Sequence, residues 1–230
     1  MIAWWIARSS LTLHLSIGKC TCQYGMEKIS KRELNKLQRR SAIVAAATRA
    51  FLEQGYAATS MSAIADELGG SKATLWSHFS SKEELFAAVT DELVARFGCN
   101  LEGTLTETVF SLEGLRGYCH RFLDKLMGEE AITLFRLIIA DGGRFPEITT
   151  VFHVRAPARI QRLATAYFAT RFPEDEAARL ARLTNCAMVG YRSHALTRPE
   201  MPSAADREQF VDDFIAHLRL PAYETVIDGV

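Results

Sequence analysis

The chain has 230 residues, of which 48% are hydrophobic and 10% aromatic, with 14 Gly and 6 Pro. This composition excludes a disordered tail, a collagen-like repeat and a small disulfide scaffold, and it fits one or two domains that fold without cross-links. Lysine plus arginine and aspartate plus glutamate both number 27, so the net charge is zero. A protein that is basic throughout is therefore excluded, but a local basic patch is not.

The positive charge is concentrated near the N-terminus. Residues 1–26 carry two bases and no acid, and residues 27–82 carry nine bases and five acids. Residues 97–230 carry fifteen bases and eighteen acids. This asymmetry permits a polyanionic partner for the N-terminal part of the chain.

The first segment, residues 1–25, predicts no folded element. Its apolar stretch is interrupted at Arg8, and the charge follows the apolar core, which is the reverse of a signal peptide. No later stretch reaches the roughly 18 apolar residues of a membrane span. Because Met26 opens a segment of ordinary composition, we expect residues 1–25 to be an extension from an upstream start codon. Residues 1–32 are predicted to be disordered, and no membrane partner is expected.

The cysteines are an odd number spread over the chain, which argues against a disulfide framework. They are Cys20, Cys22, Cys99, Cys119 and Cys186. The spacing of the first two lacks the second pair that is typical of a zinc site. The sequence therefore predicts free thiols in a reducing cytoplasm, with no metal and no cofactor.

Helical periodicity dominates from residue 33 onward. A first amphipathic helix is predicted over 33–54, with Gly55 as its stop. Its predicted apolar face consists of Leu37, Ile43, Ala47, Ala50 and Phe51. A short second helix follows the cap Thr59-Ser60 and ends at Gly69-Gly70.

Two further helices complete this region. Ser71 is predicted to cap a helix over 72–79, and Ser80-Ser81 to cap the next helix, which has Glu83 and Glu84 in its first turn. Two short helices joined by a glycine-containing turn match the helix-turn-helix pattern. One helix fits the major groove of B-DNA, and small or flexible residues at the N-terminal end of the third helix would allow close approach to base edges.

Residues 40–89 resemble the DNA-binding domain of the tetracycline-repressor (TetR) family over its whole length; they read RSAIVAAATRAFLEQGYAATSMSAIADELGGSKATLWSHFSSKEELFAAV. The Gly-Tyr after the first helix, the Thr-Ser cap, the Ile-Ala pair, Ser-Lys-x-Thr-Leu, His-Phe and Ser-Lys-Glu-x-Leu all occur at the family's spacing. Two departures are Gly70, where Val is usual, and Trp76, where Tyr is usual.

The resemblance implies a DNA-contact role for ten side chains. They are Ser60, Ser62, Ser71, Lys72, Ala73, Thr74, Trp76, Ser77, His78 and Lys82. Ser60 and Ser62 would face the DNA backbone or an outer base. The groove would be lined by Ser71, Lys72, Ala73, Thr74 and Ser77, and phosphates would be held by Trp76, His78 and Lys82. Each has an alternative: Lys72 as a solvated side chain, Trp76 packed inside the domain, His78 bridging to another helix.

Basic residues ahead of and within the first helix could extend the contact with DNA. They are Lys28, Lys31, Arg32, Lys36, Arg39 and Arg40. A solubilising basic arm explains them equally well.

The remaining chain, residues 97–220, also predicts helices only, before a tail at 221–230. Gly142-Gly143 ends one helix, and later helices are expected to start at prolines. These are Pro146, Pro157 and Pro173; Pro199 and Pro202 separate helices over 173–196 and 203–219. The expected fold is all-α, with a DNA-binding domain over 33–96 and a ligand-binding and dimerisation domain over 97–220.

The last two helices carry apolar stripes that would form a homodimer interface. The candidate residues are Leu180, Leu183, Ala187, Tyr191, Phe210 and Phe214. The alternative is that these side chains complete the core of one subunit.

Residues 135–168 are similar to the C-terminal domain of the AefR-like subgroup of these regulators. A bundle of this kind would take a small molecule between its helices. Candidate lining residues are Phe110, Tyr118, Phe122, Phe135, Ile139, Phe152 and His153, and the alternative for each is a place in the core.

The sequence therefore predicts a sequence-specific transcriptional regulator. We expect a homodimeric repressor that binds a palindromic operator in double-stranded DNA and is released by a small-molecule effector. No metalloprotease, phosphate-loop or nucleophile-elbow motif occurs, so we expect no enzyme. The alternative is a helical protein-interaction module that has lost specific DNA binding.

Overall fold

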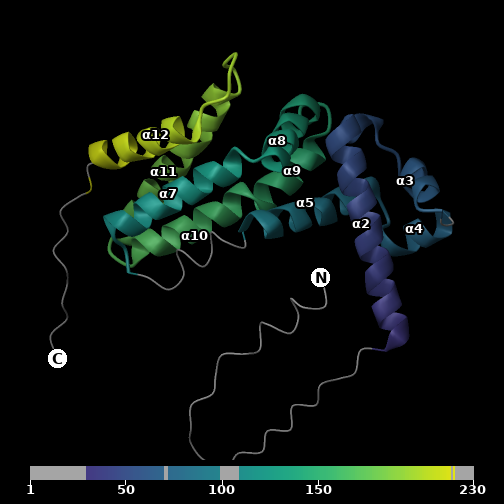
Figure 1. Ribbon diagram of the computed structural model, residues 1–230. Coiled ribbons are helices and arrows are strands. Elements are labelled where there is room, and N and C mark those ends of the chain that lie inside the picture. The colour runs from purple at the N-terminus through teal and green to yellow at the C-terminus, as the bar shows by residue number, and fades with distance from the viewer. Residues whose placement is uncertain (1–29, 70–71, 99–108, 219, 221–230) are drawn as a thin grey trace, which may run out of the picture. The chain divides into compact units, whose positions relative to one another are not determined.

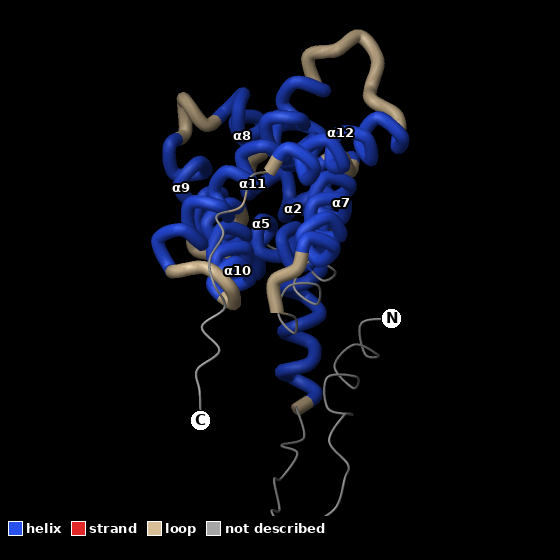
Figure 2. The backbone as a smooth tube through the Cα atoms, turned by 90° about the vertical axis from the view of Figure 1, so that its left-hand side faces the viewer, coloured by secondary structure: helices blue, strands red, loops and turns tan. Residues whose placement is uncertain are grey.

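The computed structural model describes residues 30–69, 72–98, 109–218 and 220, and in these ranges every regular element is a helix (Figures 1 and 2). The helices are α2 (Lys31–Ala58), α3 (Met61–Glu67), α4 (Lys72–His78), α5 (Lys82–Gly98), α7 (Leu112–Leu126), α8 (Glu129–Asp141), α9 (Pro146–Arg155), α10 (Pro157–Ala169), α11 (Glu174–Ala195) and α12 (Ala204–His217). The all-α expectation is confirmed for this part of the chain.

Helix α2 begins two residues before the predicted start. Ser30 and Glu33 form a capping box: the Ser30 hydroxyl accepts the Glu33 N–H at 3.2 Å, and the Glu33 carboxylate accepts the Ser30 N–H at 2.9 Å. Residues 1–36 form a unit separate from 37–230, so the two are described separately. The N-terminal extension and the tail lie largely outside the described residues.

Gly55 interrupts α2 where the sequence predicted its end. Its φ of 83° is in the left-handed region, which a residue with a side chain rarely adopts. Ile43, Ala47 and Phe51 of the predicted apolar face are buried. Leu37 on that face is 56% exposed, because the core packs against α2 only from Ile43 onward.

The two short helices are positioned by caps. The Ser60 hydroxyl accepts the Ala63 N–H at 3.1 Å and caps α3, and Gly69, with φ 60°, lies in the turn that follows. Leu75 of α4 is buried with Ile64 of α3, so that the two helices pack together. The predicted Ser71 cap lies outside the described residues.

One core joins α2–α5 to helices from the C-terminal half of the sequence. It contains Phe51, Leu75 and Phe86 together with Leu134, Leu137 and Ile138 of α8 and Ile148 of α9. Helix α5 packs along α9. The N-terminal helices therefore share their core with α8 and α9.

A second core lies between α7, α10, α11 and α12. Helix α10 packs along α11, and α7 packs against both α11 and α12. The helix boundaries match the sequence signals: Gly142 follows α8, Pro146 and Pro157 start α9 and α10, and Ser203 with Asp206 forms a capping box on α12. Among the described helices, none is both long and apolar enough to span a bilayer.

Candidate nucleic-acid interface and ligand cavity

Helix α4 presents one side to solvent and buries the other. Leu75 is 2% exposed and anchors the helix, while Lys72, Ala73 and Ser77 are exposed. Trp76 is 49% exposed, so the alternative of a tryptophan packed inside the domain does not describe the structure. The exposed side combines a cation, small side chains and an aromatic N–H donor, which suits close approach to a nucleic acid.

The other predicted contact residues are placed differently. Ser60 is exposed but its hydroxyl caps α3, and Ser62, Thr74 and His78 are half-buried. The Ser77 hydroxyl donates to the Thr74 carbonyl at 2.8 Å within α4. Ser71 and Gly70 lie outside the described residues.

Lys82 lies at the start of α5 against the tyrosine that follows Gly55. Its ammonium is 4.1 Å from the centre of the Tyr56 ring, and the Tyr56 hydroxyl donates to Glu83 at 3.2 Å. Burial lowers the pKa of Lys82, and the carboxylates of Glu83, Asp141 and Glu147 oppose that shift. Burial, with the charge of Glu83, raises the pKa of Tyr56. The aromatic ring thus positions the lysine.

The basic residues of α2 fall into two groups. Arg40 lies over the Phe79 ring at 4.8 Å, and Arg49 pairs with Glu67. Lys31, Arg32 and Lys36 are exposed in the separate unit of residues 1–36, and Lys28 is outside the described residues.

A cavity of about 1490 Å³ lies among α5, α7, α8, α9, α10 and α11. Most of its exposed wall is apolar, with Phe97, Phe122 and Phe152 among the lining side chains. Pockets of this size and character are typical of sites for small organic molecules.

Four of the seven predicted ligand residues line this cavity: Phe122, Phe135, Phe152 and His153. Phe110 packs instead among the rings of Tyr167, Phe168 and Phe172. The Tyr118 hydroxyl donates to Asn185 at 2.7 Å from a buried position, and Ile139 is 68% exposed on α8. These three residues are not part of the cavity wall.

Polar lining residues on α10 and α11 escaped the sequence analysis. Gln161 and Asn185 are linked by a hydrogen bond of 3.1 Å, and Arg192 is buried on the same cavity wall. Arg192 recurs at helical spacing with the buried Met188 and Ala195. That periodicity was a usable signal, since a charged residue on a core-facing stripe needs an explanation.

The predicted dimer residues do not all face outward. Leu180 is 4% exposed within the subunit core, whereas Leu183 is 53% exposed. Ala187, Tyr191, Phe210 and Phe214 are half-buried, and the rings of Tyr191 and Phe210 lie 4.4 Å apart. Leu183, Ala187 and Gly190 share one side of α11, on which Leu183 and Gly190 are exposed and Ala187 is half-buried; Gly190 also lines the cavity.

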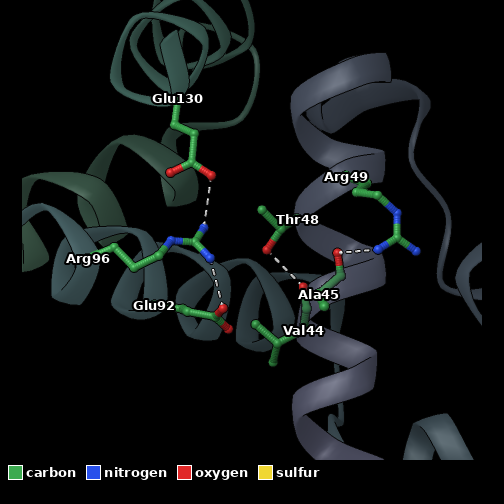
Figure 3. A network of polar contacts seen from close by, with 7 residues as sticks. All are labelled: Val44, Ala45, Thr48, Arg49, Glu92, Arg96 and Glu130. Atoms are coloured by element: carbon green, nitrogen blue, oxygen red, sulfur yellow. Dashed lines mark hydrogen bonds and ion pairs between the residues drawn. The ribbon is translucent and has the colours of Figure 1, made fainter. Parts of the chain in front are cut away.

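Ion pairs connect α5 to the helices around the cavity. Arg96 on the cavity wall bridges Glu92 of its own helix at 3.1 Å and Glu130 of α8 at 3.2 Å (Figure 3). Arg155 of α9 pairs with Asp91 of α5 at 2.9 Å. A shift of α8 or α9 at the cavity can therefore reach α5 directly through these ion pairs.

Figure 3 also shows the Thr48 hydroxyl bonded to the Val44 carbonyl within α2, at 2.8 Å.

Two family models match the chain. Residues 43–89 match the model described as bacterial regulatory proteins, tetR family. Residues 113–181 match the AefR-like transcriptional repressor, C-terminal domain.

Curated relatives match over part of their length. The chain is 37% identical over 87 residues to the HTH-type transcriptional activator FasR of Mycolicibacterium smegmatis, covering 38% of this chain and 40% of that protein. It is 36% identical over 66 residues to the HTH-type transcriptional repressor ComR of Escherichia coli, covering 29% and 31%. Each match spans about two fifths or less of the relative's length.

Solved structures match over most of both chains. A TetR-family transcriptional regulator from Mesorhizobium loti aligns with a TM-score of 0.68 and 27% identity over 79% of this chain and 95% of that one. The flavonoid-responsive regulator FrrA aligns with a TM-score of 0.64 and 25% identity over 77% and 95%.

Proposed function

Because the chain belongs to the TetR family of transcriptional regulators, with an N-terminal DNA-binding helix-turn-helix, we propose that it is a homodimeric repressor released from a palindromic operator by a small molecule. The observation that carries the proposal is the exposed side of α4. Lys72, Ala73 and Trp76 are available to a DNA groove while Leu75 holds the helix against the core. The protein acts in the cytoplasm, where its DNA is.

Within this proposal the contact residues divide by chemistry. The residues that line the major groove and determine sequence preference are Ser71, Lys72, Ala73, Thr74 and Ser77. The residues that contact the DNA backbone, and so set register and affinity, are Ser60, Ser62, Trp76, His78 and Lys82. Lys82 suits this role because the Tyr56 ring holds its ammonium at the start of α5, and the half-buried side chain keeps part of its surface in solvent.

A homodimer supplies the second reading helix. A two-fold dimer places two such helices about 34–36 Å apart, one turn of DNA. The outward side of α11 supports this assembly: Leu183 is an exposed apolar side chain, and Ala187 and Gly190 are small enough for close helix approach. Tyr191, Phe210 and Phe214 border the interface, and Leu180 belongs to the core of each subunit.

An effector in the cavity acts through the contacts shared with the N-terminal helices. Arg96 of α5 lies on the cavity wall and pairs with Glu130 of α8. Helix α8 also contributes side chains to the core that it shares with α2–α4. A ligand that fits one arrangement of α8 and α9 better than the other shifts the dimer away from DNA, with a coupling of typically about 1–3 kcal/mol. The C-terminal family model and ComR are named as repressors, which favours repression over the activation named for FasR.

Selection of binding sites from random duplex DNA by the full-length protein tests this function. We expect an inverted repeat bound specifically at moderate salt. Absence of any enriched sequence would instead support a protein-interaction module.

Two substitutions then separate the contact classes. Lys82→Ala weakens binding to all sequences and reduces the salt slope by about one. Thr74→Ala changes affinity unequally among operator variants. Equal losses on every variant for Thr74→Ala would contradict its placement in the groove.

A further inference from the structure

Arg192 carries a buried charge that no acidic residue in the described part of the chain offsets. The residue, in the last turn of α11, is 6% exposed, and its guanidinium carbon lies 3.6 Å from the centre of the Phe135 ring. Its Nε is buried without a hydrogen-bond partner, and none of the ion pairs between described residues involves Arg192. Burial lowers the pKa of Arg192 to about 10, so the group stays positively charged at neutral pH. Buried charges are usually paired, because desolvation is costly.

The unpaired guanidinium belongs to the wall of the cavity. Arg192 and Phe135 both line it, beside apolar residues from six helices. The other basic residues on the wall are more accessible: Arg121, Arg162 and Arg182 are exposed, Lys125 is half-buried, and Arg96 is already paired with two glutamates. The carboxylates on the wall, Asp124, Glu129 and Glu130, are all exposed; Asp124 pairs with Arg207 and Glu130 with Arg96. The cavity thus offers a largely apolar chamber with a single buried cation on its described wall.

Nearby polar groups do not provide the missing partner. Asn185 accepts from the Tyr118 hydroxyl and donates to Gln161, and the Gln161 amide donates to the Ala178 carbonyl at 3.1 Å. These groups satisfy one another. No described residue of the subunit therefore supplies Arg192 with an anion, which leaves that place open to a ligand in the cavity.

We propose that the cavity binds an organic monocarboxylate, whose carboxylate pairs with Arg192 and whose apolar body lies among the aromatic and aliphatic side chains. This assignment rests on the proposed ligand-responsive function and specifies its effector class. The planar guanidinium fork matches a carboxylate in two parallel hydrogen bonds. A phosphate dianion would leave one negative charge without a buried partner, which disfavours a phosphorylated ligand.

The competing explanation is structural, in which Arg192 only supports Phe135 through the ring contact. Arg192→Met separates the two, because methionine keeps an apolar stem on the ring and removes the charge. If Arg192 serves a ligand, the ligand-free variant melts at a higher temperature than wild type, since an unpaired buried charge is gone. If Arg192 serves the fold, the variant melts lower.

The binding experiment uses the full-length protein without DNA, so that it does not depend on operator recognition. Isothermal titration compares decanoate with decanamide and naphthoate with naphthamide, pairs that differ only in the charge of the head group. Decyl phosphate tests the phosphorylated alternative. We expect at least one carboxylate to bind roughly tenfold or more tightly than its amide.

Three variants locate the head group. Arg192→Met abolishes the carboxylate preference and leaves amide binding unchanged, and Arg192→Lys retains part of it. Arg182→Met, at an exposed arginine on the same helix and the same wall, leaves the preference intact.

Some results would overturn the proposal: no carboxylate preference in wild type, an unchanged preference in Arg192→Met, tighter binding of decyl phosphate than of decanoate, or a lower melting temperature for ligand-free Arg192→Met. Failure of the regulatory function looks different. In that case the carboxylate binds through Arg192, but operator DNA is not released in a gel-shift assay.

Discussion

The carboxylate of Asp141, at the end of α8, accepts the backbone N–H of Tyr56 at 2.7 Å, across 85 positions of sequence. It also accepts the N–H of Ala57 at 3.2 Å. Both donors follow the break in α2 at Gly55, and a carboxylate there satisfies backbone groups that the interrupted helix leaves unpaired. One side chain thus ties the helix on the cavity's border to the helix that supports α3 and α4.

Replacing Asp141 by alanine should lower the free energy of unfolding by about 1–3 kcal/mol, because the two N–H groups lose their acceptor. Asp141→Asn keeps one carbonyl oxygen and should lose less. Urea unfolding measures both, with the exposed Asp175→Ala on α11 as a control. An alanine variant as stable as wild type would show that water replaces the carboxylate without loss.

Trp76 offers a direct optical test of the DNA face. Its indole is 49% exposed, so a DNA backbone lying on α4 should change its fluorescence. The measurement uses a Trp4→Phe, Trp5→Phe background, in which Trp76 is the remaining tryptophan. We expect a saturable change with the selected operator, and a several-fold loss of affinity for Trp76→Phe, which lacks the N–H donor. If the fluorescence of Trp76 did not change on addition of the operator, DNA would bind a surface other than α4.

We expect the stability of the start of α5 to decrease in acid, because Glu84 holds Ser80 there through its carboxylate. Its carboxylate accepts the Ser80 N–H at 2.8 Å and the Ser80 hydroxyl at 2.7 Å, and these bonds lower the pKa of Glu84 below its ordinary 4.5. A lowered pKa in the folded state means that the stabilisation is complete above pH 4.5 and is lost as the pH falls through the lowered value.

Glu84→Gln should therefore melt below wild type at neutral pH, and the difference should shrink as the solution is acidified. Thermal melts over that range measure it, with Glu53→Gln, an exposed glutamate on α2, as the matched variant. A difference that stays constant with pH would mean that the charge of Glu84 contributes nothing.

Gly190 offers a test of the proposed dimer that is separate from the fold of the subunit. A Cβ at this position would meet no atom within 4 Å in the subunit, and a residue other than glycine favours the helix by about 1 kcal/mol. Gly190→Gln should leave each subunit folded but obstruct close approach of two α11 helices. Sedimentation should show a shift toward monomer, whereas Ala169→Gln on α10 should sediment as wild type does. An unchanged dimer would move the interface away from this stripe.

Local signals in the sequence determined the helices. Each of these signals acts on residues within a few positions of it, so its effect can be predicted from the sequence alone. They are Gly55, Ser60, the prolines that start α9 and α10, and the Ser203–Asp206 capping box. The exposed side of α4 could also be predicted from the sequence. Leu75 is the residue of this helix that the helical spacing turns toward the core, so the residues next to Leu75 point away from it.

The tertiary structure alone decided which helices share a core and which side chains meet in the cavity. The sequence predicts a domain boundary near residue 97, yet α8 and α9 pack with α2–α5, because burial joins apolar faces regardless of their separation along the chain. For the same reason periodicity could not separate Leu180 in the core from Leu183 at the surface, or Ile139 in solvent from Phe135 beneath Arg192. Side-chain spacing determines the face of a helix, whereas only packing determines what that face meets.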